Sequence, residues 1–134
     1  QHVASQNQLV FINDSKATNL TALKFALNKI SSPCVLILCG DPSKEQYDSY
    51  EIIGPIKVYI FGKHAQEISK KVFHPKIILL SNQDLSSVIN YIFKDEYHYQ
   101  TNILFSPGHP SGQDYKNFEE RGDHFTKLVL RSND

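Results

Sequence analysis

Residues 34–39 read Cys34-Val-Leu-Ile-Leu-Cys39, an uninterrupted apolar block in a chain of 134 residues. A short continuous run of this kind is typical of a strand with both faces covered, as in a parallel sheet between layers of helices. The block is the longest apolar run in the sequence, and it is far shorter than the roughly 20 residues that span a bilayer. We therefore predict a buried strand here and no membrane-spanning segment.

Further apolar blocks on either side of this strand predict the rest of a sheet, at residues 9–13, 57–61, 76–80 and 101–105. The segments between and after them show the apolar spacing of helices, at 20–30, 65–72, 85–92 and 113–130. Alternating strands and helices indicate an α/β fold, Rossmann-like and doubly wound, with a mostly parallel sheet and helices on both faces. Residues 3–5 are expected to pair with 9–13 as an N-terminal β-hairpin, and residues 1–134 are expected to form a single domain.

The composition excludes some classes of function. Fourteen basic residues balance fourteen acidic ones, whereas a nucleic-acid-binding protein normally shows a basic surplus. Cys34 and Cys39 lie five residues apart in one predicted strand, so they are expected to be buried on opposite faces and unable to pair. Residues 1–8 show no signal-peptide pattern. These features favour a reducing, cytoplasmic setting.

Ligands of doubly wound sheets bind beyond the carboxyl ends of the strands, where three polar loops are predicted, at residues 13–19, 40–46 and 106–113. In the first loop, Lys16, Thr18 and the start of the following helix suit a carboxylate or a phosphate. The alternative is that Thr18 or Asn19 only caps the helix while Lys16 is solvent-exposed. If the sheet is built as predicted, the turns at 14–18 and 106–112 meet in space.

In the third loop, Ser106-Pro-Gly-His-Pro-Ser-Gly112, two glycines and two prolines allow a tight turn whose N–H groups converge on an anion. Ser111 is expected immediately before the last helix, where it either caps that helix or donates to a ligand. Phe118 follows at helical spacing with Phe125, Leu128 and Val129, which favours a place in the core.

Several kinds of site are absent from the sequence. The six histidines and two cysteines show no metal-ligand spacing, and His109 is the histidine expected near a site. The chain has no GxxxxGK[ST] phosphate loop, so a bound triphosphate would be held by another domain. Ser111 lacks the surrounding sequence of a hydrolase nucleophile.

Two segments carry a resemblance to a known family: Phe11-Ile-Asn-Asp-Ser-Lys-Ala-Thr-Asn19, and Lys116-Asn-Phe-Glu-Glu-Arg-Gly122 together with Ser106, Pro107 and Ser111. With these motifs the chain resembles the C-terminal domain of the D-glutamate-adding Mur ligases, the UDP-N-acetylmuramoyl-L-alanine:D-glutamate ligases. The resemblance extends from about residue 3 to the last helix.

The resemblance implies part of an ATP-dependent amide ligase of peptidoglycan synthesis, and hence of cell division and cell shape. Its substrates would be D-glutamate and UDP-N-acetylmuramoyl-L-alanine, joined through an acyl phosphate. ATP and Mg²⁺ would be held mainly by a central domain. This chain lacks that domain and also lacks the N-terminal domain, which would bind the nucleotide sugar. The isolated chain is therefore expected to bind no cofactor and to be inactive.

The resemblance also implies roles for individual residues. Lys16 and Thr18 would contact D-glutamate, with Lys16 as the catalytic residue of the set. Ser111, Gly112 and Phe118 would hold its carboxylates, partly through main-chain N–H groups.

Asp14 is expected to face ATP near its adenosine end. Lys44 is the candidate for a lysine that contacts the side-chain carboxylate, although it stands one residue later than the family's lysine. Gly108-His-Pro110 replaces the alanine- and cysteine-containing loop that is usual after Ser-Pro.

Two alternatives remain from the residues alone. The first is a free-standing, non-catalytic α/β module that binds an anion or a nucleotide. The second is a small regulatory domain, which is disfavoured because the sequence lacks the clustered acidic residues of a phospho-acceptor pocket. The ligase interpretation requires a GKT-type phosphate loop upstream of this chain, and the alternatives do not.

Overall fold

The computed structural model describes residues 2–6, 8–31, 33–44, 49–111 and 114–132. A six-stranded sheet runs through it in the order β1-β2-β8-β3-β5-β7. These strands are β1 (His2–Gln6), β2 (Leu9–Asn13), β8 (Thr101–Phe105), β3 (Cys34–Leu38), β5 (Lys57–Gly62) and β7 (Ile77–Ser81). All neighbours pair in parallel except β1, which forms an antiparallel hairpin with β2. The mostly parallel sheet and the N-terminal hairpin confirm the predicted fold class.

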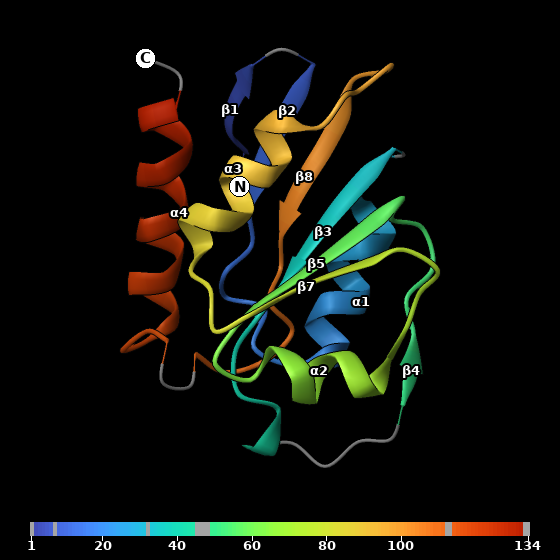
Figure 1. The fold of residues 1–134 in the computed structure, drawn as a ribbon, viewed down its shortest axis with the longest axis vertical. Coiled ribbons are helices and arrows are strands. Elements are labelled where there is room, and N and C mark those ends of the chain that lie inside the picture. Colours follow the sequence, from blue (N-terminus) through green and yellow to red (C-terminus); the bar gives the residue numbers. More distant parts are fainter. Residues whose placement is uncertain (1, 7, 32, 45–48, 112–113, 133–134) are drawn as a thin grey trace.

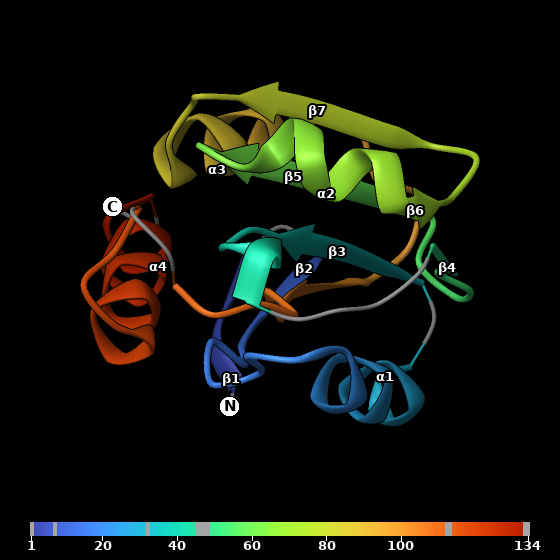
Figure 2. The ribbon, with the colours of Figure 1, turned by 90° about the horizontal axis from the view of Figure 1, so that it is seen from below.

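Helices cover both faces of the sheet (Figures 1 and 2). The helices are α1 (Leu20–Lys29), α2 (Ala65–Lys71), α3 (Leu85–Lys94) and α4 (Phe118–Ser132). The apolar side chains of α3 and α4 belong to one buried cluster, and those of α1 and α2 belong to a second cluster on the opposite face. The sheet is therefore the middle layer of three.

The apolar block of β3 has the position that its sequence predicts. Val35 and Ile37 point into the cluster under α3 and α4, whereas Leu36 and Leu38 point into the other cluster. Every residue of the strand is buried, because helices lie on both sides of it. Fully burying one such side chain stabilises a fold by about 1.5–3 kcal/mol, so this strand alone is a large part of the core.

The two cysteines confirm the expected alternation. Cys34 is buried in the cluster beneath α1 and α2, and Cys39 is buried in the cluster beneath α3 and α4. Both thiols are free. Burial raises the pKa of each thiol to about 12, so both cysteines are neutral core residues rather than nucleophiles.

Hydrogen bonds define the N-caps of two helices, and the cap of α1 is one of the two residues that the sequence predicted. Asn19 caps α1, with its side-chain oxygen accepting from the backbone N–H of Ala22 at 2.8 Å. Asp84 caps α3 by accepting from the backbone N–H of Ser87. Thr18 is therefore not the cap of α1.

The chain after β3 contains two short elements that the sequence analysis did not predict. The short helix η1 (Pro42–Lys44) lies within the predicted loop 40–46, and β4 (Tyr50–Glu51) follows and pairs in parallel with β6 (Val72–Phe73). A strand of two residues is too short to show an alternating pattern.

The start of α4 also differs from the prediction. The helix begins at Phe118 rather than at residue 113, and Asn117 caps it by accepting from the N–H of Glu120 at 2.8 Å. The sequence predicted that Ser111 lies directly before the helix, and this prediction was wrong. Phe118 is 40% exposed, so the prediction of a core position was wrong. Arg121, one turn later in α4, contacts the loops at the edge of the sheet. Phe118 therefore lies beyond the end of the apolar core.

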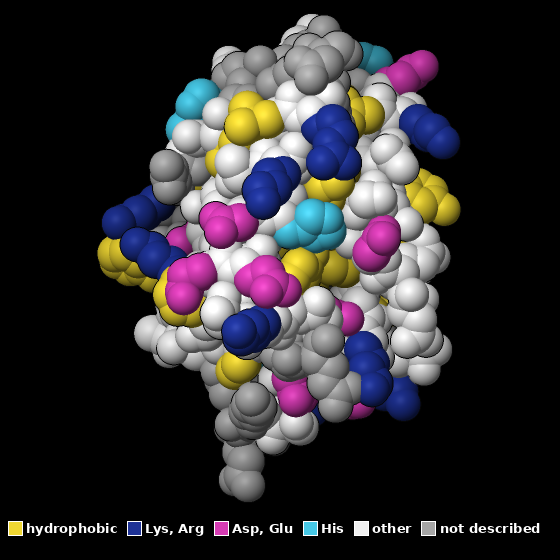
Figure 3. All heavy atoms as spheres, turned by 90° about the vertical axis from the view of Figure 1, so that its left-hand side faces the viewer, with side chains coloured by type: hydrophobic (Ala, Val, Ile, Leu, Met, Phe, Trp, Pro, Cys, Tyr) yellow, Lys and Arg dark blue, Asp and Glu magenta, His cyan; other side chains and the backbone are white. Residues whose placement is uncertain are grey.

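No helix among the described residues is long and apolar enough to cross a membrane. Acidic and basic side chains are interspersed on the face that carries α4, as Figure 3 shows. That face of the molecule offers no extended basic surface to a nucleic acid.

Candidate functional site

The loops after β2 and β8 meet at the carboxyl edge of the sheet, because the two strands are parallel neighbours. The N–H of Asp14 donates to the carbonyl of Phe105 at 2.8 Å, and the hydroxyl of Ser106 donates to the Asp14 carboxylate at 2.9 Å. Further along, the N–H of Gly108 donates to the carbonyl of Ala17 at 2.8 Å. The predicted meeting of these turns is confirmed, and the two loops form one hydrogen-bonded unit.

The loop after β3 joins the same unit. The N–H of Asp41 donates to the carbonyl of Pro110 at 2.8 Å. Gly40 precedes it with a φ of 108°, and a Cβ atom at this position would lie 2.3 Å from the carbonyl oxygen of Pro110. Only glycine allows both this backbone conformation and this approach. All three loops predicted to carry the site therefore lie at one edge of the sheet.

Arg121 binds two of these loops together from inside the protein. Its side chain is completely buried, and it donates from Nη1 to the carbonyl of His109 at 3.0 Å and from Nη2 to the carbonyl of Ser15 at 2.8 Å. A buried guanidinium is strongly disfavoured unless its N–H groups are bonded. The two loops are thus held at a fixed distance by one side chain of α4.

The sequence contained an overlooked signal for this role of Arg121. Arg121 precedes Phe125 and Val129 by four and eight residues, so it lies on the buried stripe of α4. Phe125 and Val129 are fully buried. An arginine on an apolar stripe is a candidate for a buried structural cation, whereas Arg121 entered the sequence-based interpretation only as part of a family motif.

Gly122 lets α4 approach the β2 loop closely. A Cβ atom on this glycine would lie 2.2 Å from the hydroxyl oxygen of Ser15. The side-chain amide of Asn13 donates to the carbonyl of Gly122 at 3.2 Å. The Arg-Gly pair of the family motif therefore has a direct structural reason: the arginine bonds the loops and the glycine leaves room for them.

Two predicted site residues of the β2 loop, Asp14 and Lys16, line a hollow of about 460 Å³. Asp14 is half-buried and Lys16 is exposed. Apolar side chains also line the hollow, among them Phe25, Ala26 and Ile30. Thr18 is half-buried beside them in the chain. A lysine near a helix start favours an anion at this place.

The other predicted site residues come from three further segments. Ser111 is buried in the β8 loop, Phe118 is exposed at the first residue of α4, and Lys44 is the last residue of η1. Gly112 lies outside the described residues. Each of these segments reaches the carboxyl edge, but no hydrogen bond between the described site side chains of different segments is present besides that of Ser106 with Asp14. A binding role for these residues stays a prediction.

His109 is part of the structure of the site. The side chain is completely buried, with Nδ1 at 3.1 Å from the carbonyl of Pro107. Burial lowers the pKa of His109 to about 4, although hydrogen bonds to the carbonyls of Pro107 and Cys39 favour the protonated ring. His109 is therefore a neutral packing residue at pH 7. Among the described residues, no group of three histidine, cysteine or carboxylate side chains is arranged to hold a metal ion.

Comparison with known proteins relates the chain to one group of enzymes. It is 34% identical over 134 residues to a UDP-N-acetylmuramoylalanine–D-glutamate ligase of Prochlorococcus marinus, a match that covers 95% of this chain and 28% of that protein. A ligase of the same name from Petrotoga mobilis is 34% identical over 97% of the chain and 30% of its own length. One from Buchnera aphidicola is 34% identical over 96% of the chain and 30% of its own length.

These matches confirm the resemblance that the two motifs indicate, over nearly all of the chain. The chain spans less than a third of the length of the curated relatives it matches. No protein-family model matches it.

Replacing Arg121 with methionine should unfold the three-loop unit. The carbonyls of Ser15 and His109 would lose their donors, and each buried unsatisfied group costs about 1–3 kcal/mol. We expect the free energy of unfolding in urea to fall by about 3 kcal/mol. Arg131→Met is the matched control, because the chain has only these two arginines and Arg131 is exposed. Equal losses in the two variants would contradict the role of Arg121.

The buried neutral state of His109 predicts a loss of stability in acid. The pKa of His109 lies below its ordinary value of 6.5 in the folded protein, so the unfolded chain binds the extra proton first as the pH falls. Its contribution is complete above pH 6.5 and is lost progressively towards pH 4, by about 2 kcal/mol between pH 7 and pH 5. Urea unfolding of the wild type and of His109→Gln at both pH values measures it. The wild type should lose more stability than the variant, and parallel losses would exclude His109 as the cause.

Proposed function

We propose that this chain is the C-terminal, amino-acid-binding domain of a ligase that joins D-glutamate to UDP-N-acetylmuramoyl-L-alanine in peptidoglycan synthesis. The similarity to D-glutamate ligases over 95% or more of the chain supports this assignment. The structural observation that supports it most directly is the union of the β2 and β8 loops. It gathers the segments of both family motifs at the edge where doubly wound sheets bind ligands.

D-glutamate carries two carboxylates, and the three loops offer groups of matching chemistry. On the β2 loop, Lys16 supplies a cation and Thr18 a hydroxyl next to the start of α1. On the β8 loop, Ser111 supplies a hydroxyl, with Gly112 and Phe118 further along the chain. Charge-assisted hydrogen bonds to a carboxylate are the strongest that such groups make. A carboxylate held on each loop would fix the orientation of the amino acid between them.

The main role of this domain would be to position the amine of D-glutamate. The amine must reach the activated acyl carbon unprotonated and correctly oriented, and such positioning supplies a large part of an enzymatic rate. Lys16 is the proposed catalytic residue and Lys44 a further contact to the side-chain carboxylate. Closing this domain on its neighbours would also exclude water from the site.

ATP, with Mg²⁺, would supply the chemistry that activates the substrate's carboxylate as an acyl phosphate. The described residues include no loop that fits a triphosphate, so a central domain would hold it. Asp14 fits a smaller role in nucleotide binding, because it lines the hollow beside α1 and its carboxylate can accept from ribose hydroxyls. The N-terminal and central domains of the same ligase, in the cytoplasm, are the proposed partners of this chain.

A second candidate function is a free-standing module that binds an anion or a nucleotide without catalysis. The hollow beside α1, with Lys16 among its lining residues, would serve such a module equally well. The coding sequence upstream of residue 1 distinguishes the two functions, because the ligase requires a central domain with a GKT-type phosphate loop.

The Lys16→Ala substitution in the full-length ligase tests the proposed site. Loss of a charged contact to a carboxylate corresponds to about a tenfold to hundredfold change in a binding constant. We expect the KM for D-glutamate to rise, or kcat to fall, by at least about tenfold. Lys24→Ala, an exposed lysine on α1, is the control and should behave as the wild type. Unchanged kinetics of the Lys16 variant would remove Lys16 from the site.

The isolated chain should show no ligase activity, because nothing in its described residues fits the triphosphate. An assay for ADP release with D-glutamate, ATP and UDP-N-acetylmuramoyl-L-alanine measures this directly. Weak binding of D-glutamate alone, followed by NMR at the amides of Thr18 and Ser111 with L-glutamate as the control, should remain detectable. Product formation by the chain alone would refute the proposal that another domain binds ATP.

A further inference from the structure

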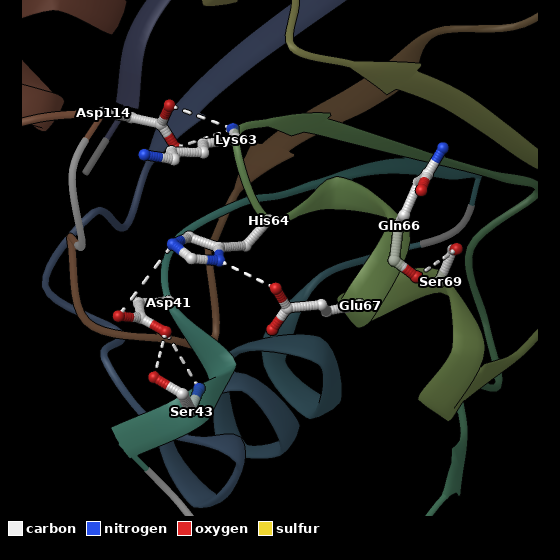
Figure 4. Close-up of polar contacts among 8 residues, drawn as sticks. All are labelled: Asp41, Ser43, Lys63, His64, Gln66, Glu67, Ser69 and Asp114. Carbon is white, nitrogen blue, oxygen red and sulfur yellow. Dashed lines mark hydrogen bonds and ion pairs between the residues drawn. The ribbon is translucent and has the colours of Figure 1, made fainter.

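His64 occupies the turn between β5 and α2, at the same edge of the sheet as the three loops. It stands at the N-cap position of α2, but its side chain makes no capping hydrogen bond. Instead the imidazole lies between Glu67 of its own helix and Asp41 of the β3 loop (Figure 4). Its side chain is only 15% exposed. The imidazole of His64 therefore does not cap α2, and its contacts lie elsewhere.

The two ring nitrogens of His64 face two carboxylates. Nδ1 lies 3.2 Å from Oε1 of Glu67, and Nε2 lies 4.0 Å from Oδ2 of Asp41. The Nε2 atom is shielded from solvent and has no hydrogen-bond partner among the described residues. Asp41 is itself largely buried, with 14% of its side chain exposed, whereas Glu67 is 58% exposed. The contact with Asp41 is therefore the less solvated of the two.

The tautomer of the ring decides which carboxylate it can bond. A neutral imidazole has one N–H donor and one nitrogen lone pair. If Nδ1 carries the proton, the lone pair of Nε2 faces the carboxylate of Asp41, and if Nε2 carries it, the lone pair of Nδ1 faces Glu67. Glu67 is the more exposed carboxylate and can be hydrated instead, so an N–H on Nε2, directed towards the less solvated Asp41, suits this arrangement. Lys63 and Asp114 are drawn with the ring in Figure 4, where the side chain of Lys63 lies beside Asp114.

Asp41 connects His64 to the rest of the site. Its Oδ1 accepts from the N–H of Ser43 at 2.9 Å and from the hydroxyl of Ser43 at 2.6 Å, which fixes the turn that leads into η1. Its backbone N–H donates to Pro110 of the β8 loop at 2.8 Å. A change in the position of the Asp41 carboxylate therefore moves the β3 loop and, through the backbone hydrogen bond to Pro110, affects the β8 loop.

We propose that His64 is a positioning residue that holds the β3 loop against the β8 loop by its contact with Asp41. It does not touch the substrate. Its consequence for catalysis rests on the proposed function, because the β3 loop leads to Lys44 and the β8 loop carries Ser111. Displacing Asp41 changes the relative position of the segments that are proposed to hold the two carboxylates of D-glutamate.

Hydrogen exchange of the Asp41 amide in the 134-residue chain tests the structural part. In His64→Ala, which removes the ring and its donor, exchange of this amide should accelerate by about tenfold, as expected for the loss of one charge-assisted contact. His98→Ala is the matched control, since His98 is exposed. An Asp41 amide that exchanges equally fast in the wild type and the His64 variant would overturn the proposal.

Asp41→Asn provides a second, nearly isosteric test. The asparagine amide can donate to a neutral Nε2, so the β3 loop should remain docked and the Asp41 position should keep its slow exchange. ¹⁵N shifts of the His64 ring should place the proton on Nε2 in the wild type and on Nδ1 in this variant. The same tautomer in both would contradict the contact, and so would rapid exchange in the asparagine variant.

In the full-length ligase, His64→Ala should raise the KM for D-glutamate by about tenfold while the KM for ATP stays the same. His64→Gln should keep a KM close to that of the wild type, because the glutamine amide can donate to the Asp41 carboxylate. Normal kinetics in His64→Ala together with faster exchange would refute the positioning role and leave the proposed function intact. Loss of the proposed function would instead appear as unchanged kinetics on replacing Lys16.

Discussion

The hydrogen bonds of the Arg121 guanidinium are the constraint on which the rest of the site depends. This cation has no exposure to water, and it reaches the carbonyls of two loops that lie far apart in the sequence. Its burial is tolerable only while both acceptors stay in place, so the guanidinium and the loops stabilise each other. The β2 loop, the β8 loop and the first turns of α4 therefore form one unit, and the β3 loop is added to it through Asp41.

The unusual β8 loop of this chain is well integrated into that unit. Gly108, His109 and Pro110 differ from the loop that the family resemblance implies, and each provides a defined contact. Gly108 adopts a φ of 77° and donates to Ala17, His109 offers its carbonyl to Arg121, and Pro110 offers its carbonyl to Asp41. The sequence difference therefore leaves the backbone connections between the three loops in place.

Most of the fold could be predicted from the sequence because its strands are short, continuous apolar blocks. The run at residues 34–39 shows how direct this relation is: a strand covered on both faces has no polar side. The strands β4 and β6 could not be predicted, since two residues carry no periodicity. Phe118 was assigned to the core from its spacing, but spacing does not show how far a helix extends beyond the sheet. The meeting of the β2 and β8 loops followed from parallel pairing, whereas the contacts of His64 with Asp41 and Glu67 depend on side-chain placement that no motif indicates.

The two bonds of Arg121 are made to main-chain oxygens, which every amino acid possesses. The side chains of Ser15 and His109 are therefore not what the guanidinium recognises, and evolution can exchange loop residues while this connection persists. Arg121 and Gly122 of α4 cannot be exchanged in this way. The first position requires a long planar cation, and the second requires the absence of a side chain. Mutational drift in relatives should consequently accumulate in the loops that meet the ligand, and the pair on α4 should change last.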